Sequence, residues 1–398
     1  MIHLFLNGLG ASAGAGLTYL FNVLPHLATN PAVHTTLAVQ PHLRGEFRRI
    51  PSVTLLEADT PQSTVARFWF EQNRLPECIR NSGADALISA GNFALRKSPV
   101  PQILLSGNSL YTSADFDRDL WQRREFGMLL DNRIKSVFAR KSVHWADCTV
   151  APTKAFADEL KRWTGNEVRA IHHGFDHEMF FRDHSALADD VQRRLLDTED
   201  SVKLLFVSHY NYYRNFETLF RALPLITGNL KPRKVRLFLT CKLQNDANPG
   251  AYRVQKASAL IQRLGIRDEV VELGAIPYRS LHHVYRACDI YVTPAYTETF
   301  AHPLVEAMAS GLPIVASDLP VHREVAAEAA CYFPRFSAEA LADNVVRLAA
   351  NMQLKTNLAE AGRQRSAHFS WKTHVEQLLD LAFSIKQRPR SKAAATAA

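Results

Sequence analysis

Residues 290–318 read IYVTPAYTETFAHPLVEAMASGLPIVASD, and this stretch decides the fold. The β-branched run at 290–293 predicts a buried strand, and a second such run follows at 313–316. Between them a helix is expected to open at Pro303, a residue favoured in the first turn, and to close at Gly311. A strand, a helix and a strand in this order form a βαβ unit, which joins parallel strands.

Two carboxylates stand within this unit. Glu298 lies on the loop before the expected helix, and Glu306 is expected in its first turn, where the helix dipole favours a negative charge. Both can therefore face the carboxyl ends of the strands, where ligands bind in open α/β sheets. The loop amides from Thr299 to His302 are expected to be free for phosphate or sugar oxygens. A capping acid beside an unrelated loop acid is the alternative interpretation.

The rest of the chain repeats the same alternation of short apolar runs and amphipathic stretches, which is typical of parallel sheets in the α/β class. A polar region at 183–201 has no strand pattern, so a domain boundary is expected there or just before it. We predict domains at 1–180 and 181–370, a last helix at 371–385 that packs with the first domain, and a disordered basic tail at 386–398. Strands are expected at 2–7, 35–39, 53–57, 86–89, 102–106, 149–151, 169–172, 203–208, 235–240, 270–273, 290–293, 313–316 and 331–333.

Bulk properties agree with two domains. The chain has 398 residues, 47% hydrophobic and 22% charged, which is ordinary globular composition but too long for one core. No apolar run approaches the ~20 residues of a membrane span, and the first residues lack the basic and apolar regions of a signal peptide. The 5 cysteines are scattered without a CxxC pair, which favours free thiols over a disulfide frame or a zinc ribbon. A cytoplasmic location is expected.

The formal net charge of +8 has a local source in the polar tail, which carries Lys386, Arg388, Arg390 and Lys392. Such a tail allows a weak contact with the anionic inner face of a membrane. Nucleic-acid binding is not expected, because basic residues are not interleaved with aromatic residues along any stripe.

A glycine-rich segment follows the first expected strand. Residues 8–16 read GLGASAGAG, and Gly10, Gly14 and Gly16 could let backbone N–H groups approach an anion at the start of a helix at 17–27. The spacing is not GxGxxG, and no acidic residue ends the second strand, which argues against an NAD enzyme. A tight turn without a ligand is the alternative.

A second candidate segment reads LLFVSHYNYYRNFE at 204–217. A strand is expected to end at Ser208, and the polar aromatic loop then brings Arg214 to the start of a helix. A cation beside free helix N–H groups suits a diphosphate. An ordinary loop arginine paired with a surface acid is equally compatible with this segment.

Two other groups of residues are weaker candidates for a functional site. The adjacent pairs His172-His173 and His282-His283 have side chains that diverge, and HExxH is absent, so no catalytic metal is expected. Phe68-Trp69-Phe70, Trp121 and Trp145 could line an acceptor groove, although aromatics at helical spacing more often belong to the core.

Taken together, these segments resemble the family 4 type of retaining glycosyltransferases, described as glycosyl transferases group 1. Glu298 and Glu306 form its Glu-x7-Glu pair, and the following EAMASGLPIVASD is as that family has it. The similarity covers nearly the whole chain and is most specific from about 204 to 371. Further similar segments are Arg214-Asn215, IHHGFDHEMF at 171–180, GAIP at 274–277 and FSW at 369–371.

The resemblance implies a GT-B fold, in which two Rossmann-like domains face each other across a cleft, together with a nucleotide-sugar donor, retention at the anomeric carbon and no metal or other cofactor. Glu306 would bind the ribose hydroxyls, and Glu298 would contact the transferred sugar. Arg214 would neutralise the leaving diphosphate, and Ile276 would offer backbone contacts to the base. The remaining donor-binding residues would be Ser208, His209, Thr299, Phe300, Ala301 and His302. The residues expected near the phosphates or the acceptor are Gly10, Gly14, Gly16 and Asn108.

Three positions depart from the family pattern. Ser208-His209 stand where the family has Gly-Arg, so His209 could act as a phosphate cation only when protonated. The loop Glu298-Thr-Phe-Ala-His-Pro303 replaces Glu-Gly-Phe-Gly-Leu-Pro, which places polar groups near the sugar. In the segment LSGNSLY at 105–111 the family's histidine is absent, and Asn108 or Ser109 would substitute for it.

The predicted function is transfer of a sugar from a UDP- or GDP-sugar to a hydroxyl acceptor, in polysaccharide, glycolipid or other glycoconjugate synthesis. Two alternatives remain open. One is a nucleotide-sugar epimerase of the same fold. The other is an inactive scaffold that regulates a partner transferase, which the loss of the family arginine at His209 keeps open.

Overall fold

The computed structural model describes residues 1–11, 14–61, 63–183, 186–196, 201–245 and 252–387, with the backbone alone described at residues 14 and 15. Two compact units are present. Unit 1 comprises Met1–Gly174 and Ser370–Ala398, and unit 2 comprises Phe175–Phe369. The part of the tail beyond residue 387, for which we predict disorder and a membrane contact, lies outside the described residues.

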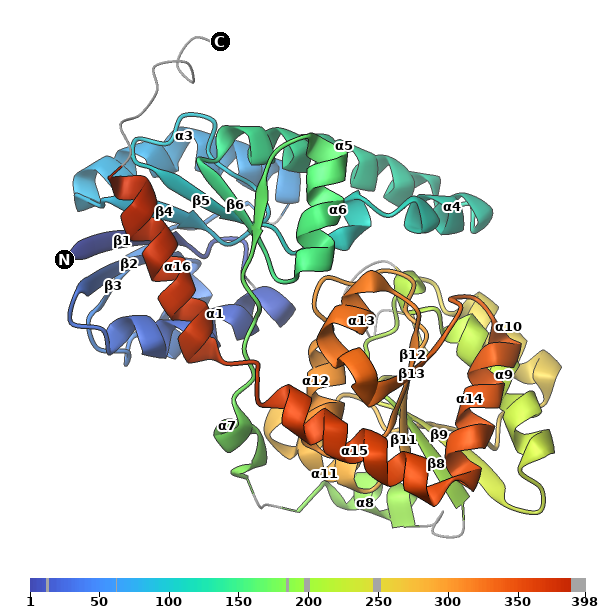
Figure 1. Ribbon diagram of the computed structural model, residues 1–398. Helices are drawn as coiled ribbons and strands as arrows, with labels where there is room; N and C mark the ends of the chain where they lie inside the picture. Colours follow the sequence, from blue (N-terminus) through green and yellow to red (C-terminus); the bar gives the residue numbers. More distant parts are fainter. Residues whose placement is uncertain (12–13, 62, 184–185, 197–200, 246–251, 388–398) are drawn as a thin grey trace. The chain divides into compact units, whose positions relative to one another are not determined.

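Unit 1 is built on a seven-stranded parallel sheet with the order β3-β2-β1-β4-β5-β6-β7 (Figure 1). The order reverses at β1, so the topological switch point lies between the carboxyl ends of β1 and β4. Its strands are β1 (Ile2–Asn7), β2 (Val33–Val39), β3 (Val53–Glu57), β4 (Ala86–Ser89), β5 (Gln102–Leu105), β6 (Cys148–Ala151) and β7 (Val168–Ala170).

Helices cover both faces of this sheet (Figure 1). Their bounds are α1 (Gly14–Ala28), α2 (Arg44–Phe47), α3 (Thr64–Ser82), α4 (Ala114–Gln122), α5 (Phe126–Trp145), α6 (Lys154–Thr164) and α16 (Trp371–Lys386), with short 3-10 turns η1 (Pro41–Leu43) and η2 (Ser109–Tyr111).

The last helix, α16, belongs to unit 1 although it follows unit 2 in the chain. It packs beside α1 and contributes apolar side chains to the core that also contains β1 and β2. Within this packing the Tyr19 hydroxyl lies 2.9 Å from His374 Nε2, and His374 Nδ1 lies 2.8 Å from the backbone oxygen of His172. Burial lowers the pKa of His374 to about 4, so the ring is neutral and acts as a hydrogen-bonding core residue.

Unit 2 contains a six-stranded parallel sheet with the order β10-β9-β8-β11-β12-β13. Here the switch point lies between the carboxyl ends of β8 and β11. The strands are β8 (Ser201–Phe206), β9 (Lys234–Leu239), β10 (Val270–Glu272), β11 (Ile290–Thr293), β12 (Ile314–Ser317) and β13 (Ala330–Phe333).

The helices of unit 2 also lie on both faces of their sheet (Figure 1). They are α7 (His177–Phe181), α8 (Asp189–Leu196), α9 (Phe216–Asn229), α10 (Gln255–Leu264), α11 (Leu281–Arg286), α12 (His302–Ala309), α13 (Pro320–Ala326), α14 (Ala338–Ala350) and α15 (Met352–Ser366), with 3-10 turns η3 (Tyr212–Arg214), η4 (Tyr278–Ser280) and η5 (Ala327–Ala329).

All thirteen predicted strands are present, with ends that differ from the expected ones by two residues at most. The division between the units lies at Gly174, earlier than the expected end of the first domain at residue 180. The reason is aromatic packing: Phe180 contacts the rings of Phe175 and Tyr278, which draws this segment into unit 2. Among the described residues no helix is both long and apolar enough to cross a membrane.

Gly174 is a point at which the main chain of unit 1 passes very close to the start of α16. A Cβ on residue 174 would lie 2.0 Å from the backbone nitrogen of Trp371. We therefore expect Gly174→Ala to lower the free energy of unfolding by about 1–3 kcal/mol, measured by chemical denaturation. Gly228→Ala is the matched control, because its added Cβ meets nothing within 4 Å and a helical alanine should stabilise by up to ~1 kcal/mol. Equal stability of Gly174→Ala and the parent protein would contradict this close approach.

Candidate functional site

The candidate site of unit 2 lies at the switch point of its sheet, where the loops after β8 and β11 meet. Asn215 joins the two loops, because its side-chain amide donates to the backbone oxygen of Pro294 at 3.0 Å. The backbone N–H of Tyr296 donates to the oxygen of Tyr213 at 3.0 Å. Asn215 adopts a left-handed conformation with φ 57°, which asparagine tolerates better than most residues, and it begins α9. These contacts fix Arg214 opposite the loop that carries Glu298.

Arg214 and Glu298 form an ion pair through the Arg214 Nη1 and Glu298 Oε1 atoms. The side chains are 20% and 9% exposed, respectively. The guanidinium also lies over the ring of Tyr213, 5.0 Å from its centroid. Its Nε atom is buried and has no hydrogen-bond partner among the described residues. A guanidinium held in this way retains donors for an anionic ligand.

Glu306 lies farther along α12 than expected. The helix begins at His302, so Glu306 is its fifth residue, and no acidic residue occupies the first turn. The prediction that the helix dipole stabilises this carboxylate was therefore wrong. Glu306 is instead buried, and the Tyr285 hydroxyl from α11 lies 2.8 Å from its Oε2 atom.

Burial raises the pKa of Glu306 to about 7, although the hydrogen bond from Tyr285 opposes the rise. The Tyr285 hydroxyl also lies 3.1 Å from the backbone oxygen of Pro303. Its single proton can serve only one of these acceptors at a time. When Glu306 is protonated it can donate to Tyr285, which then donates to Pro303; when Glu306 is ionised, Tyr285 donates to the carboxylate. The carboxyl group thus has a hydrogen-bonding arrangement for both of its protonation states.

The loop from Thr299 to His302 carries a strained residue. Ala301 has φ 64°, a left-handed conformation that is uncommon for a residue with a Cβ, and it caps the start of α12. Thr299, Phe300 and His302 each make contacts of their own. The Phe300 ring, for example, packs edge-on against Phe369 with centroids 5.3 Å apart. The availability of the loop amides for a ligand stays a prediction.

The remaining donor residues lie on neighbouring loops of the same sheet edge. The backbone N–H of Ser208 donates to the Thr240 hydroxyl at 3.0 Å, while His209 next to it is exposed. Ile276 is half-buried and follows Gly274, which has a φ of 86° and where an added Cβ would lie 3.2 Å from Lys242 Cε. Ser208, His209 and Ile276 therefore follow the carboxyl ends of β8 and β10, as their order in the sequence predicts.

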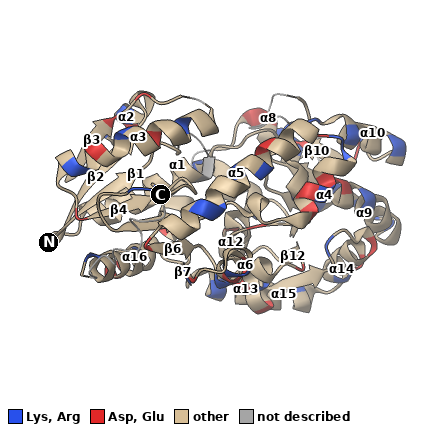
Figure 2. Cartoon of the chain, turned by 90° about the horizontal axis from the view of Figure 1, so that it is seen from above, with Lys and Arg blue, Asp and Glu red and all other residues tan. Residues whose placement is uncertain are grey.

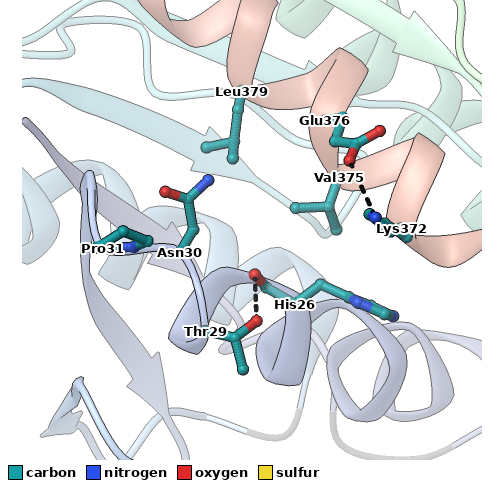
Figure 3. A pocket seen from close by; sticks show the side chains of 8 residues that line it. All are labelled: His26, Thr29, Asn30, Pro31, Lys372, Val375, Glu376 and Leu379. Atoms are coloured by element: carbon teal, nitrogen blue, oxygen red, sulfur yellow. Dashed lines mark hydrogen bonds and ion pairs between the residues drawn. The ribbon is translucent and has the colours of Figure 1, made fainter.

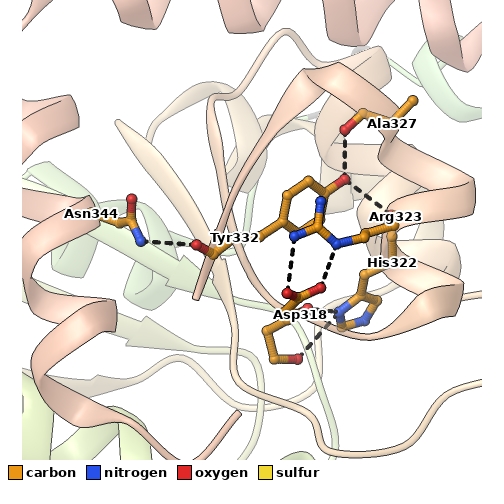
Figure 4. A network of polar contacts seen from close by, with 7 residues as sticks. Asp318, His322, Arg323, Ala327, Tyr332 and Asn344 are labelled. Carbon is orange, nitrogen blue, oxygen red and sulfur yellow. Dashed lines mark hydrogen bonds and ion pairs between the residues drawn. The ribbon is translucent and has the colours of Figure 1, made fainter. Parts of the chain in front are cut away.

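Polar contacts also fix the end of the segment 290–318 (Figure 4). The Arg323 guanidinium binds the Asp318 carboxylate, with Nη2 to Oδ2 at 2.9 Å, and this hydrogen bond lowers the pKa of Asp318. Arg323 also lies over the Tyr332 ring, 4.6 Å from its centroid. His322 is buried, its pKa is lowered to about 4 by burial, and its Nδ1 donates to the Ser317 backbone oxygen at 2.9 Å. This network is an internal brace of the β12–α13 connection.

Unit 1 has its own polar cluster at its switch point. The loops after β1 and β4 approach each other so closely that a Cβ on Gly10 would lie 3.4 Å from the α-carbon of Gly91 and 3.6 Å from Arg67 Nη2. Arg67 on α3 pairs with Glu71, Nε to Oε1 at 3.4 Å, and the side chains are only 14% and 9% exposed. Asn7, at the end of β1, donates to Glu71 Oε2 at 2.9 Å. The cluster places a shielded guanidinium beside the glycine loop.

The other predicted residues of unit 1 have mainly structural roles. Gly16 lies in α1, and a Cβ there would lie 3.1 Å from the α-carbon of Ala11, so this glycine permits close packing of the loop on the helix. Gly14 is the first residue of α1. The Asn108 side chain accepts a hydrogen bond from the Leu110 N–H at 3.1 Å and caps the turn η2. Part of the predicted anion loop, residues 12 and 13, lies outside the described residues.

The aromatic residues do not all belong to the core. Phe68 is buried, as expected, but Trp69 is 53% exposed and Trp121 is 63% exposed. The core interpretation was therefore wrong for these two tryptophans. The cause is that Trp69 lies on the outer side of α3, and Trp121 lies at the end of the short helix α4.

A surface pocket between α1 and α16 contains none of the predicted site residues (Figure 3). It includes His26 and Asn30 from one side and an ion pair between Lys372 and Glu376, 4.0 Å apart, from the other. Among the described residues no group of three or more His, Cys, Asp or Glu side chains is arranged to hold a metal ion.

Sequence reasoning missed Tyr285, Arg67 and Glu71. Tyr285 precedes Glu306 by 21 residues, and only the packing of α11 on α12 brings the hydroxyl to the carboxylate. Arg67 and Glu71 have the i,i+4 spacing of a helical ion pair. This spacing predicts the ion pair, but it does not predict that the pair lies beside Gly10.

Comparisons with known proteins agree with this arrangement. Residues 189–365 match the family model described as Glycosyl transferases group 1. A D-inositol 3-phosphate glycosyltransferase of Xylanimonas cellulosilytica is 27% identical over 253 residues, which are 61% of this chain and 58% of that protein. The matched part thus spans little more than half the length of this curated relative.

Solved structures match over almost the whole chain. The sucrose-phosphate synthase of Thermosynechococcus elongatus has a TM-score of 0.71 at 17% identity, over 96% of this chain and 99% of that chain. The Anabaena protein HepE, solved in complex with UDP-glucose, has a TM-score of 0.71 at 17% identity, over 96% and 100%.

These parallel-sheet units and their relatives define the fold as GT-B, which confirms the predicted fold class. Residues 189–365 form a glycosyl transferases group 1 domain, which confirms the resemblance first drawn from Glu298 and Glu306.

Proposed function

We propose that this chain is a glycosyltransferase that takes a sugar from a nucleoside diphosphate sugar and transfers it to a hydroxyl acceptor. The observation that carries the proposal is the position of the Arg214–Glu298 pair. It lies where the strand order of unit 2 reverses, the place where open α/β sheets bind ligands. The glycosyl transferases group 1 domain and the relatives named above support the same class of activity.

Each donor residue has a role in this proposal. Arg214 binds the diphosphate, and its guanidinium stabilises the charge that develops as the nucleoside diphosphate leaves. Glu298 orients Arg214 before the donor binds and turns to the sugar hydroxyls in the donor complex. Ionised Glu306 accepts hydrogen bonds from the ribose hydroxyls, with Tyr285 holding the carboxylate. The backbone at Ile276 contacts the base, and Ser208, His209 and the loop from Thr299 to His302 surround the phosphates and the sugar.

The transfer breaks the bond between the anomeric carbon and the diphosphate oxygen. The acceptor oxygen forms the new bond to that carbon, and its proton leaves with a basic oxygen of the departing diphosphate or a nearby carboxylate. We propose retention of the anomeric configuration, which the resemblance to the family 4 type implies. We also propose no requirement for a metal or another cofactor, because Arg214 and nearby N–H groups supply positive potential at the leaving group.

The acceptor is assigned to unit 1, at the loops after β1 and β4. Gly10 and Gly91 leave room for a ligand to approach the backbone, and Gly14, Gly16 and Asn108 lie on the adjoining segments. Arg67 supplies a shielded cation beside Gly10, which suits an acceptor with an anionic group close to its reacting hydroxyl. The acceptor belongs to a polysaccharide, glycolipid or related glycoconjugate.

Calorimetry with UDP, GDP and ADP on the full chain is the first test of the proposed function. Binding of one nucleotide in preference to the others supports the donor site, and it also chooses the base. No binding of any of the three at millimolar concentration would reject the donor site. Incubation with the matching nucleotide sugars, followed by NMR of the anomeric proton, then tests transfer and retention.

The two alternatives give different results in the same experiment. Binding without transfer or slow donor hydrolysis would favour a regulatory scaffold, for which exposed His209 in place of the family's arginine is the motivating observation. Conversion of a nucleotide sugar without any acceptor would favour an epimerase. A cytoplasmic location with contact at the inner face of a membrane also remains our proposal.

A further inference from the structure

Helix α5 exposes a row of large apolar side chains to solvent. Phe126, Leu130, Ile134 and Val137 are 51%, 62%, 42% and 53% exposed. Their spacings of four, four and three residues place them on one face of the helix. The opposite face packs on unit 1 through Leu129, Asn132, Ala139, Ser142 and Val143. The outer row is therefore not a core face.

Exposed tryptophans extend this row at its sides. Trp121, at the end of α4, packs edge-on against Phe126 with ring centroids 5.2 Å apart. Trp69 from α3 lies edge-on to Phe138 of α5 at 6.3 Å. We call Trp69, Trp121, Phe126, Leu130, Ile134 and Val137 the α5 apolar patch. Patches of contiguous exposed apolar side chains on one element usually mark an interaction surface.

Figure 2 shows basic residues along α5 and acidic residues on α4. Arg133, Arg140 and Lys141 are exposed on the same outer side of the helix. Arg133 pairs with Asp117 of α4 at 3.2 Å, whereas neither Arg140 nor Lys141 has an ion-pair partner within the described part of the chain. The one acidic residue of α5, Asp131, is neutralised by Lys135 at 2.6 Å. The α5 side of the border is thus positively charged. On the α4 side, Asp115, Asp117 and Asp119 each pair with an arginine.

We propose that the α5 apolar patch docks unit 1 onto an anionic lipid bilayer. A helix with large apolar side chains on its outer face and Lys or Arg beside them lies in the interface of such a bilayer, and tryptophan favours the same depth. The anionic headgroups complement Arg140 and Lys141, because basic side chains beside a bilayer are attracted to its negative surface potential. A symmetric contact between two copies of this chain would instead bring the same cations together.

This inference concerns unit 1 alone and does not depend on the proposed donor site. It also differs from a contact through the basic tail, because α5 supplies both the apolar and the charged component. Membrane docking would place an enzyme beside a lipid-linked acceptor, but vesicle binding can be measured without knowing the acceptor.

Flotation of the full chain with vesicles tests the proposal. We expect binding to vesicles of phosphatidylcholine with phosphatidylglycerol in equal parts, weaker binding to phosphatidylcholine alone, and loss of the difference at high salt. Leu130→Gln combined with Ile134→Gln should weaken binding about tenfold or more, because two inserted side chains are lost. Arg140→Gln combined with Lys141→Gln should weaken binding to the anionic vesicles about tenfold and leave binding to phosphatidylcholine unchanged.

Matched controls distinguish the α5 apolar patch from an isolated exposed apolar residue and from the basic tail. Leu225→Gln on α9, a residue 40% exposed, should leave binding unchanged. Neutralising the tail with Arg388→Gln, Arg390→Gln and Lys392→Gln should also leave most of the binding. Vesicle binding that survives the Leu130/Ile134 change, or that disappears with the tail charges, would overturn the proposal.

Native mass and UDP affinity are two further measurements. The first tests whether a second copy of the chain occupies the α5 apolar patch, and the second tests the donor site separately. A change of native mass in the Leu130/Ile134 variant without any vesicle binding by the parent protein would assign the patch to a second copy and overturn the membrane proposal. UDP affinity should be the same in all α5 variants. Vesicle binding without UDP binding would count against the donor site while leaving the docking surface supported.

Discussion

Arg214→Gln is expected to weaken UDP binding about 10–100-fold, because a charge-assisted hydrogen bond of about 1.5–3 kcal/mol to the diphosphate is lost. Transfer should fall by about 10²–10³, the typical loss when a donor to a leaving or developing anion is removed. Uridine, which lacks the diphosphate, should bind the variant and the parent protein equally. Calorimetry with both ligands measures this difference.

The ion pair with Glu298 complicates this substitution, so a second variant is needed. Arg214→Gln also leaves Glu298 without its cation in a position where it is only 9% exposed. In Glu298→Gln the guanidinium is retained, so UDP binding should remain close to that of the parent protein while transfer falls. Arg221→Gln, an exposed arginine on α9, controls for the change of net charge. Equal UDP and uridine losses in Arg214→Gln would contradict the diphosphate role.

Glu306→Gln is expected to weaken nucleotide binding about 10–100-fold at pH 8, where the carboxylate of the parent protein is ionised and accepts from the ribose. The pKa of about 7 adds a pH dependence. Below pH 7 the free protein holds a proton that the ribose must displace, so uridine affinity should fall by about tenfold per pH unit. The glutamine variant should lose this dependence. Uridine is the ligand of choice, because it has no phosphate that titrates in the same range.

The same variant gives a test of folding energetics. The raised pKa means that the folded protein binds more protons than the unfolded chain between pH 4.5 and about 7, so the Glu306 contribution to stability falls as pH rises through this window and is constant above it. The free energy of unfolding of Glu306→Gln, relative to that of the parent protein, should therefore rise by up to about 3 kcal/mol as the pH increases from 4.5 to about 7. Glu328→Gln, the same change at an exposed carboxylate of unit 2, is the control. A stability difference independent of pH would show that Glu306 is not held protonated.

The sheets were predictable because their strands are buried on both faces. Runs such as those of β1 and β11 are almost continuously apolar, and turn residues bound them, so their limits follow from the local pattern. The donor loops were predictable for a related reason: Arg214 and Glu298 lie on the loops that follow β8 and β11, whose ends meet at one edge of the sheet.

Contacts between distant elements could not be predicted from local patterns. The start of α12 at His302 moved Glu306 out of the first turn, and the packing of α11 then decided its partner, Tyr285. Similarly, the exposure of Trp69 and Trp121 depends on which face of α3 and α4 the sheet covers. A hydrophobic residue on a helix indicates a face, but only the fold decides whether that face is covered.

The hydrogen bond between the Phe175 N–H and the Phe369 oxygen, 3.1 Å long, joins the first and last residues of unit 2. Unit 2 is therefore an insertion whose two ends leave from one place, and Gly174 and Ser370 are likewise neighbours in unit 1. Because these ends are adjacent, residues 175–369 could be removed, circularly permuted or replaced by the matching segment of a relative. None of these changes would require the backbone of either unit to stretch. The proposed donor site and the proposed docking surface lie in different units, so each could be exchanged without the other.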